Sequence, residues 1–196
     1  MIIGLTGGIG SGKSVIAHGL QALGYTLYDT DYEAKQLLKT PELTAKIKLL
    51  LGNGAYDENG NYQTAFVADK VFTRPELLQQ LNSIVHPAVQ EDIVNKYQQL
   101  IRCTNPDGVN HLIVESAILF ESGLNRICDK TIAVTAPMQT RIQRVINRDA
   151  TTIDKVRARM GAQMIDSERV QRADITVCND GSATIDQLCL YIKQHL

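Results

Sequence analysis

Hydrophobic residues gather in five short runs along the chain, and longer stretches with helical spacing separate these runs. Short, continuous apolar runs are typical of strands buried on both faces, and strands that alternate with helices are typical of a parallel sheet. The sequence therefore predicts a three-layer α/β fold with a five-stranded parallel sheet. The expected strands are Ile2–Leu5, Thr26–Tyr28, Leu112–Val114, Thr131–Val134 and Ile175–Val177.

One long segment, from about Tyr32 to Arg102, interrupts this alternation between the second and third strands. Its apolar residues recur at helical spacing, and Gly52-Asn53-Gly54 and Glu58-Asn59-Gly60-Asn61 supply turns between the helices. We expect a helical insert that overhangs the carboxyl edge of the sheet, where ligands bind in open α/β folds. The expected helices are Tyr32–Leu38, Pro41–Leu51, Pro75–Leu81 and a longer one from about Pro87 to Ile101.

A second segment, Arg144–Arg172, follows the fourth strand and is rich in arginine. A basic helical hairpin at this place suggests a lid. The alternative is a solvated helix face on which acidic residues balance the arginines, and we favour it for most of them. The acidic residues that would balance the arginines are Asp149, Asp154, Asp166 and Glu168.

Three local features indicate turns and helix ends. Pro106-Asp107-Gly108 predicts a turn that leads into the third strand. His86-Pro87 is either a substrate contact or the start of the long helix, and we favour the helix start because proline is tolerated in a first turn. Asn179-Asp180-Gly181-Ser182 follows the last strand, where a loop could pass beside a nucleotide base. We expect a helix to start there, with Asp180 or Ser182 as its N-cap.

Composition narrows the class of protein. A length of 196 residues fits one domain, or one domain with inserted subdomains, and a net charge of −1 gives no sign of an unaided nucleic-acid or membrane surface. The apolar run at the start is too short for a signal peptide or a membrane helix. The four cysteines lack C-x-x-C spacing, so we expect reduced, mostly buried thiols in a cytoplasmic enzyme.

The strongest motif is Gly7-Gly8-Ile9-Gly10-Ser11-Gly12-Lys13-Ser14, which matches G-x-x-x-x-G-K-[ST] and is followed by a helix expected at Val15–Leu23. Glycines let backbone N–H groups turn inward around phosphate oxygens, and the helix N-terminus adds unpaired donors. Lys13 would reach the β- and γ-phosphates, and the Ser14 hydroxyl would bind Mg²⁺. The motif predicts a nucleoside triphosphate site.

Three further groups could serve phosphoryl transfer. Asp29-Thr30-Asp31 ends the second strand, where alternation would place both carboxylates on one side, ready to accept a proton from an alcohol; either aspartate could instead cap the next helix. Arg144 and Arg148 stand four residues apart, so both could face a triphosphate or both could face solvent. Glu115 ends the third strand, where a carboxylate could support a Mg²⁺ shell.

These residues together resemble the dephospho-CoA kinase family. The resemblance covers essentially the whole chain, and the sequence departs from the family at Val15, Thr30 and Ala117, where threonine, alanine and proline are common. None of these changes removes a catalytic residue. The matching residues, in family order, are Gly4–Ser14, Asp29-Thr30-Asp31, Val71-Phe72, His86-Pro87, Ile118–Glu121, Arg144, Arg148-Asp149, Ala162-Gln163, Ala173-Asp174 and Asn179-Asp180-Gly181.

The resemblance implies a P-loop kinase that uses ATP and Mg²⁺ to phosphorylate the ribose 3′-hydroxyl of dephospho-CoA, the last step of coenzyme A synthesis. Asp31 resembles the catalytic base, and Lys13 and Arg144 resemble the residues that stabilise the transferring phosphoryl group. Asp29, Asp31 and His86 would contact the acceptor. The residues implied in ATP binding are Thr6, Gly8, Gly10, Ser11, Gly12, Lys13, Ser14, Val15, Arg148, Asn179 and Gly181, the last two beside adenine.

The resemblance also implies how the chain is divided. Residues 1–31, 103–143 and 173–196 would form the core, residues 32–102 the CoA-binding insert and residues 144–172 the lid. The partner would be the small molecule dephospho-CoA, bound by a monomer or weak homo-oligomer.

Other classes of nucleotide-binding protein fit less well. Another small-molecule or nucleotide kinase on the same scaffold is the nearest alternative, because the phosphate motif does not select the acceptor. A GTP-dependent switch would carry N-K-x-D, but Asn95-Lys96-Tyr97-Gln98 lacks the aspartate. A dinucleotide-binding oxidoreductase fails because Lys13 breaks G-x-G-x-x-G after Gly8-Ile9-Gly10.

Overall fold

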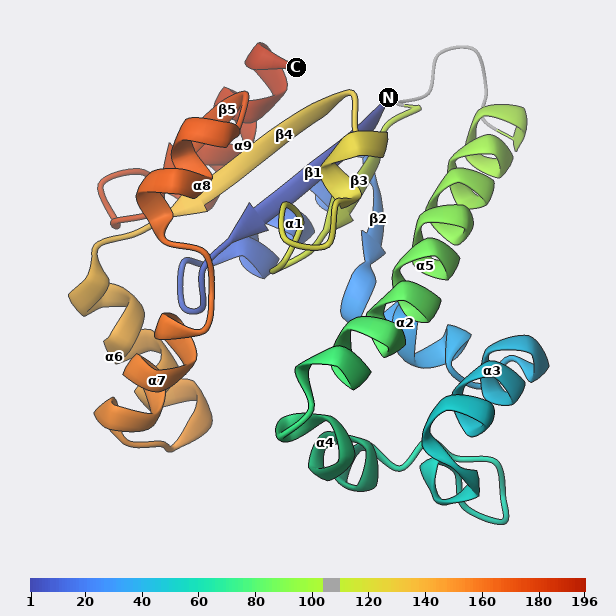
Figure 1. The fold of residues 1–196 in the computed structure, drawn as a ribbon. Coiled ribbons are helices and arrows are strands. Elements are labelled where there is room, and N and C mark those ends of the chain that lie inside the picture. The colour runs from blue at the N-terminus through green and yellow to red at the C-terminus, as the bar shows by residue number, and fades with distance from the viewer. Residues whose placement is uncertain (104–109) are drawn as a thin grey trace. The chain divides into compact units, whose positions relative to one another are not determined.

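The computed structural model describes residues 1–103 and 110–196, so the turn predicted at Pro106-Asp107-Gly108 lies outside the described residues. The chain divides into two compact units. Met1–Asp29 and Lys96–Leu196 form the first, which we call the sheet unit, and Thr30–Asn95 forms the second, which we call the helical unit. Figure 1 shows the elements of both units in chain order.

Five parallel strands form the sheet, in the order β2-β3-β1-β4-β5 (Figure 1). The predicted α/β fold and all five predicted strands are confirmed, and each strand extends slightly beyond its apolar run. The central strand β1 has β3 and β4 as its neighbours, so its carboxyl end lies between theirs. The bounds are β1 Ile2–Gly7, β2 Thr26–Asp29, β3 Leu112–Glu115, β4 Lys130–Thr135 and β5 Ile175–Cys178.

Alternation along β1 determines what covers each face of the sheet. Ile3 and Leu5 are fully buried in an apolar cluster with residues of α1 (Lys13–Ala22) and α9 (Ile185–His195). Gly4 faces the other side, where a Cβ would lie 2.7 Å from a methyl carbon of Leu119. Both faces of β1 are therefore packed, and this packing fixes the direction in which the strand leads into the loop before α1.

The arginine-rich segment forms three helices instead of the predicted hairpin: α6 (Met138–Asp149), α7 (Ile153–Gly161) and α8 (Asp166–Arg172). The first two pack together, as a hairpin would, whereas α8 lies against β4. The buried apolar residues between α6 and α7 are Ile142, Val145 and Val156.

The arginines of this segment are of two kinds. Arg148 and Arg159 are exposed and pair with Asp149, which confirms the solvated face for this part of the segment. Arg169 is fully buried and pairs with Asp166, so a solvated face is the wrong interpretation there. The sequence alone does not separate them, because arginines of both kinds have an aspartate nearby in the chain and burial depends on how α8 packs against β4.

The start of α9 corrects the predicted N-cap. Thr184 is the N-cap, and its hydroxyl accepts a hydrogen bond from the N–H of Gln187, whose side chain in turn accepts from the N–H of Thr184. Ser182 donates both its N–H and its hydroxyl to Asp180, so these two residues close a turn before the helix. The reciprocal capping box satisfies two backbone donors at once, which explains why the helix starts later than predicted.

The cysteines and the helices bear on two expectations from composition. All four cysteines are free, but Cys103 and Cys178 are exposed, so the expectation of mostly buried thiols is wrong for these two. Cys178 lies at an outward-facing position of the edge strand β5, and Cys103 ends α5. Burial raises the pKa of the Cys128 thiol to about 12. None of the helices in the described ranges combines the length and the hydrophobicity that a membrane span requires.

The helical unit is built around its own apolar cluster. It contains α2 (Thr30–Leu37), α3 (Pro41–Leu51), the short 3₁₀ helix η1 (Asn53–Ala55), α4 (Thr64–Phe72) and α5 (Pro75–Cys103) as far as Asn95. Helix α3 has the predicted bounds, α5 contains two predicted helices, and α2 begins two residues before the predicted Tyr32–Leu38 and ends one residue earlier. Helix α4 is not among the predicted helices. The buried residues of the cluster are Leu43, Ile47, Leu51, Ala55, Tyr56, Val67 and Leu81.

Helix α5 corrects the prediction of two separate helices. It runs without a break from Pro75 to Cys103, with Pro87 in its interior, so His86-Pro87 is not a helix start. Proline removes one backbone donor and is unfavourable inside a helix. The helix continues because Leu81, Val89 and Ile93 are buried on both sides of the proline. His86 is half-buried within this helix, and burial lowers its pKa.

Candidate functional site

The glycine-rich loop joins the carboxyl end of β1 to the start of α1. Gly10 and Gly12 have φ angles of 80° and 90°, a region that L side chains rarely adopt. Gly12 is the N-cap of α1 and offers no side chain to the first-turn N–H groups of that helix. The helix begins at Lys13, two residues before the predicted Val15, which is exposed. This arrangement leaves the unpaired backbone donors of a helix N-terminus available to an anion.

Lys13, Ser14 and Glu115 meet beside this loop. Glu115 is buried at the end of β3, where it is in register with Leu5 of β1 and with Asp29 of β2. The Lys13 ammonium group and the Ser14 hydroxyl both donate to the same oxygen of Glu115. The sequence indicated Glu115 only through its place at a strand end. The structure brings its carboxylate to the lysine and the serine of the phosphate motif.

Two buried hydroxyl groups point to a polar ligand at the same place. Thr6, in β1, and Ser11, in the loop, are each fully buried, and within the described ranges neither hydroxyl has a hydrogen-bond partner. A buried hydroxyl without a partner costs about 1–3 kcal/mol. Phosphate oxygens would supply acceptors for both groups, so the chemistry of this cradle fits a nucleotide.

Arg144 and Asn179 contact the glycine-rich loop, whereas Arg148 does not. The Arg144 guanidinium donates to the carbonyl oxygens of Gly10 and Ser11, each at 3.4 Å, and to Oδ1 of Asn179 at 3.4 Å. The Asn179 amide is buried and donates to the Ser11 carbonyl oxygen at 3.0 Å. Arg148, one turn further along α6, is exposed and donates to Asp149 at 2.6 Å. That bond raises the pKa of Arg148 and lowers the pKa of Asp149.

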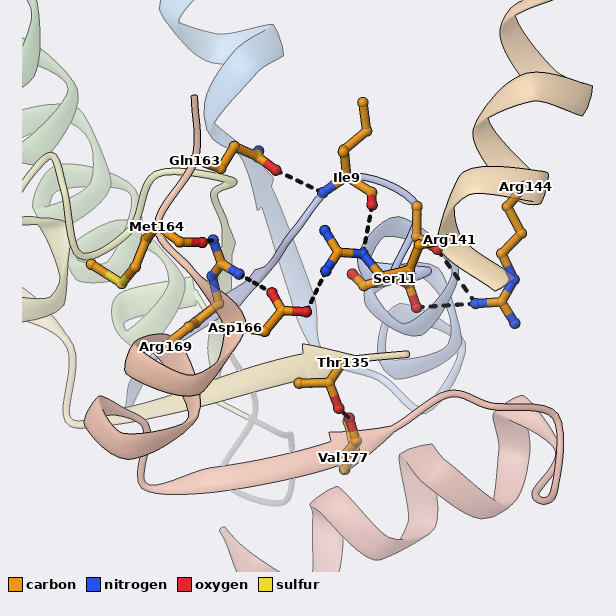
Figure 2. A network of polar contacts seen from close by, with 11 residues as sticks. Ile9, Ser11, Thr135, Arg141, Arg144, Gln163, Met164, Asp166, Arg169 and Val177 are labelled. Carbon is orange, nitrogen blue, oxygen red and sulfur yellow. Dashed lines mark hydrogen bonds and ion pairs between the residues drawn. The ribbon is translucent and has the colours of Figure 1, made fainter. Parts of the chain in front are cut away.

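A second arginine of α6, Arg141, was not among the residues predicted for the site. It is buried, donates to the carbonyl oxygen of Ile9 at 2.9 Å and forms an ion pair with Asp166 (Figure 2). Gln163 accepts a hydrogen bond from the N–H of Ile9 at 2.9 Å. The signal that could have found Arg141 is its position three residues before Arg144, on the same face of a helix.

The glycines of the motif are explained by these neighbours. A Cβ on Gly8 would lie 2.2 Å from Nη2 of Arg141, and one on Gly10 would lie 2.4 Å from the Arg141 carbonyl oxygen. A Cβ on Gly12 would lie 2.1 Å from the amide nitrogen of Asn179. Gly181, in contrast, has a positive φ of 96°, and a Cβ there would meet no described atom within 4 Å, so its role is in the turn. Gly8, Gly10 and Gly12 leave no room for a side chain, because α6 and Asn179 lie against the loop at these positions.

Two of the candidate acceptor residues, Asp29 and Asp31, occupy the junction after β2. Asp29 ends β2 and is exposed, whereas Asp31 lies in the first turn of α2 and is also exposed. The predicted alternation of the two carboxylates is wrong, because the helix already begins at the buried Thr30. Asp31 and His86 belong to the helical unit, and the other candidates belong to the sheet unit.

The residues present suit a magnesium nucleotide. The described part of the chain contains no group of three or more His, Cys, Asp or Glu side chains that could hold a metal by themselves. Mg²⁺ in kinases is typically bound through one or two protein oxygens together with phosphate oxygens and water. The Ser14 hydroxyl and the neighbouring Glu115 carboxylate are oxygens of the required kind.

Comparison with known proteins agrees with this geometry. The profile of a family described as dephospho-CoA kinase matches residues 1–184. The dephospho-CoA kinase of Fusobacterium nucleatum is 34% identical over 182 residues, which cover 93% of this chain and 91% of that protein. The crystal structure of TT1252 from Thermus thermophilus is 31% identical, with a TM-score of 0.82 over 99% of this chain and 96% of that chain.

A further solved structure supports the fold alone. It is the dephospho-CoA kinase from Campylobacter jejuni, which is 23% identical and has a TM-score of 0.71 over 98% of this chain and 95% of that chain. The family match spans both units, from β1 to the start of the last helix. The chain therefore belongs to the dephospho-CoA kinase family.

Proposed function

We propose that this kinase transfers the γ-phosphoryl group of ATP to the ribose 3′-hydroxyl of dephospho-CoA, the final step of coenzyme A synthesis. The products are coenzyme A and ADP. The observation that carries the proposal is the set of Lys13, Ser14 and Arg144 around the glycine-rich loop, in a chain that matches the family over residues 1–184.

The glycine-rich loop and Lys13 bind the phosphates of ATP. The N–H groups at the start of α1 donate to phosphate oxygens, and the Lys13 ammonium contacts the β- and γ-phosphates. The Lys13 side chain is 14% exposed, so water weakens its field less than it would at the surface. Thr6 and Ser11 donate their buried hydroxyls to the same ligand.

Arg144 and Ser14 prepare the site for the charge that develops during transfer. Arg144 approaches from α6 and stabilises the transferring phosphoryl group. The Ser14 hydroxyl would hold Mg²⁺, and the bound ion would neutralise charge on the phosphate oxygens. Glu115 accepts a hydrogen bond from the Ser14 hydroxyl and so orients this ligand. Asn179 accepts a hydrogen bond from Arg144 and donates one to the Ser11 carbonyl oxygen, so we assign it the role of positioning Arg144 against the loop. It lies in the segment with Gly181 that we place beside adenine.

Asp31 is the base. Its carboxylate lies in the first turn of α2, directly after the strand that brings the chain to the carboxyl edge of the sheet. It accepts the proton of the ribose 3′-hydroxyl as that oxygen attacks phosphorus.

Asp29 and His86 contribute to binding of the acceptor. Arg148 contributes to binding of ATP when the lid closes and water is excluded.

The assembly and location of the enzyme follow from the same reasoning. A small-molecule acceptor requires neither nucleic acid nor a membrane, so we propose a cytoplasmic enzyme that acts as a monomer or weak homo-oligomer. Size-exclusion chromatography with light scattering over a range of concentrations measures the oligomeric state directly.

The test is the rate of ADP formation by the purified chain with MgATP. Dephospho-CoA should support turnover of roughly 1–100 s⁻¹, the usual range for kinases. Adenosine and AMP, which lack the pantetheine arm, should be much poorer acceptors, and GTP should be a poorer donor. No stimulation by dephospho-CoA, with ATP still bound, would remove the acceptor from the proposal and leave another small-molecule kinase as the better interpretation.

A further inference from the structure

Arg141 joins α6 to the phosphate-binding loop at Gly8 and Ile9. Its Nε donates to the Ile9 carbonyl oxygen at 2.9 Å, its Nη1 pairs with Asp166, and its Nη2 lies where a Cβ of Gly8 would be. The whole residue is 7% exposed. Two of its nitrogens therefore bond a loop carbonyl and a carboxylate, and the third would lie 2.2 Å from a Cβ on Gly8. Figure 2 shows this guanidinium between Ile9 and Asp166.

Asp166 is itself held by a second buried arginine. Arg169 pairs with the other carboxylate oxygen of Asp166 and donates to the Met164 carbonyl oxygen at 2.9 Å. Two guanidinium groups thus share one carboxylate, and one positive charge remains beside the loop. Burial and Arg169 lower the pKa of Arg141 while Asp166 raises it, and a guanidinium stays protonated under such influences.

Both backbone polar groups of Ile9, the residue that Arg141 contacts, are hydrogen-bonded. The N–H of Ile9 donates to Gln163, and the carbonyl of Ile9 accepts from Arg141. Hydrogen bonds therefore hold both backbone groups of Ile9 in a loop that contains Gly8, Gly10 and Gly12. Glycine-rich segments lose more conformational entropy on ordering than other segments do, so a loop ordered in advance binds its ligand more tightly.

We propose that Arg141, held by Asp166, is a positioning residue for nucleotide binding: it fixes Gly8 and Ile9 so that the N–H groups further along the loop converge on the phosphates before the nucleotide arrives. Arg144 lies one turn further along the same helix and contacts Ser11. The contact between Arg141 and Ile9 therefore also positions Arg144 against the loop. The inference rests on the proposed function only in that the ligand is a nucleotide.

The test compares Arg141→Gln and Arg141→Lys with Arg159→Gln. Arg159 is a matched control because it is an arginine of the same segment, paired with an aspartate but 53% exposed in its side chain. Calorimetry with MgADP measures nucleotide affinity without any acceptor, and initial rates at saturating ATP measure the KM for dephospho-CoA.

Arg141→Gln should raise the Kd for MgADP by about 10- to 100-fold, the effect of losing charge-assisted hydrogen bonds that order the loop. Arg141→Lys should show a smaller rise, because one ammonium group keeps the charge but cannot bond Ile9 and Asp166 in the fork geometry. The KM for dephospho-CoA should stay within about twofold of wild type in both variants, since only the nucleotide loop changes. Arg159→Gln should leave both values unchanged.

A wild-type Kd for MgADP in folded Arg141→Gln would overturn the proposal, and so would equal rises in the Kd and in the KM for dephospho-CoA. If Arg141→Gln does not fold, Arg141→Lys and Asp166→Asn decide the question. Because Asp166 acts through Arg141, Asp166→Asn should weaken nucleotide binding in the wild type and add little in the Arg141→Lys background. Additive effects would contradict this link. Nucleotide binding is measured without acceptor, so a wrong acceptor assignment would leave these results intact.

Discussion

The sheet unit and the helical unit carry their candidate functional residues in different ways. In the sheet unit, residues far apart in the chain converge on one short loop: Arg141 and Gln163 hold Ile9, and Asn179 holds Ser11. The helical unit is built around an apolar cluster from neighbouring helices. Its candidates are an exposed Asp31 at a helix start and a half-buried His86 in a helix interior.

The two units therefore encode specificity in different ways. Phosphates are the same in every nucleotide, so a fixed motif and a rigid polar frame suffice to bind them. An acceptor is recognised by a surface, and the residues of such a surface have no short signature. We therefore expect changes at the residues that contact the glycine-rich loop to alter nucleotide binding, and changes in the helical unit to alter turnover or stability while nucleotide binding stays intact.

The largest effect is expected for Asp31→Asn. Loss of the base should lower turnover by about 10²–10⁴-fold, the usual contribution of a positioned general base, with little change in the Kd for ATP. Initial rates and calorimetry measure the two quantities. Asp69→Asn, an exposed aspartate on α4 of the same unit, is the matched control. Turnover close to that of the wild type would remove Asp31 from the base role.

Lys13→Ala should affect both binding and chemistry. The lysine contacts phosphates in the ground state and in the transition state, so we expect a turnover loss of about 10²–10³-fold and a Kd for ATP raised by roughly tenfold. Lys155→Ala, an exposed lysine on α7, should change neither quantity. A Lys13→Ala variant that binds ATP as tightly as the wild type would contradict the contact proposed between Lys13 and the phosphates.

Ile47→Ala should destabilise the helical unit. Ile47 is fully buried in the cluster of that unit, and such a truncation costs about 2–5 kcal/mol in the free energy of unfolding. Leu49→Ala, on the same helix and 91% exposed, should cost within about 0.5 kcal/mol. Urea unfolding measures both. The Kd for MgADP of folded Ile47→Ala should equal that of the wild type. A large rise would show that nucleotide binding depends on the packing of the helical unit.

The smallest effect is expected for Asp174→Asn in the sheet unit. Asp174 accepts hydrogen bonds from the N–H and the hydroxyl of Thr131, at 2.8 and 2.7 Å, and these bonds lower its pKa. A lowered pKa in the folded state means that the ionised carboxylate stabilises the fold above its unfolded pKa of about 3.9. This contribution is lost as the pH falls through the folded pKa.

The wild type should therefore be slightly more stable than Asp174→Asn at pH 7, and the difference should shrink below about pH 4. Urea unfolding of both proteins across this range is the measurement. A difference that is constant with pH would show that the hydrogen bonds do not depend on ionisation of Asp174.

Much of the sheet unit could be predicted because its signals are local. The apolar runs predict all five strands, and the motif ending in Lys13-Ser14 predicts the loop and the helix after it. The bonds made by Arg141 could not be predicted, because they depend on where α6 and α8 pack. Thr184 caps its helix through a partner three residues later, and this capping-box spacing is present in the sequence.

The helical unit was harder to predict. Helix α4 has Phe66, Val67 and Val71 at helical spacing, but it is short and follows an asparagine-rich turn. Pro87 suggested a boundary inside α5, because proline disfavours helix in the residue before it. Packing of the apolar residues on either side overrode this local preference. The acceptor residues rest on the family resemblance, since exposed carboxylates such as Asp31 look alike in sequence whether or not they act as bases.

The most direct test of the central claim is to identify the product of the wild-type chain with MgATP and dephospho-CoA. Mass spectrometry gives the number of phosphoryl groups added, and phosphorus NMR gives the position of the new phosphate. We expect one phosphoryl group on the ribose 3′-hydroxyl and one ADP for each product formed. Release of inorganic phosphate with unchanged dephospho-CoA, or phosphate at a different hydroxyl, would contradict it.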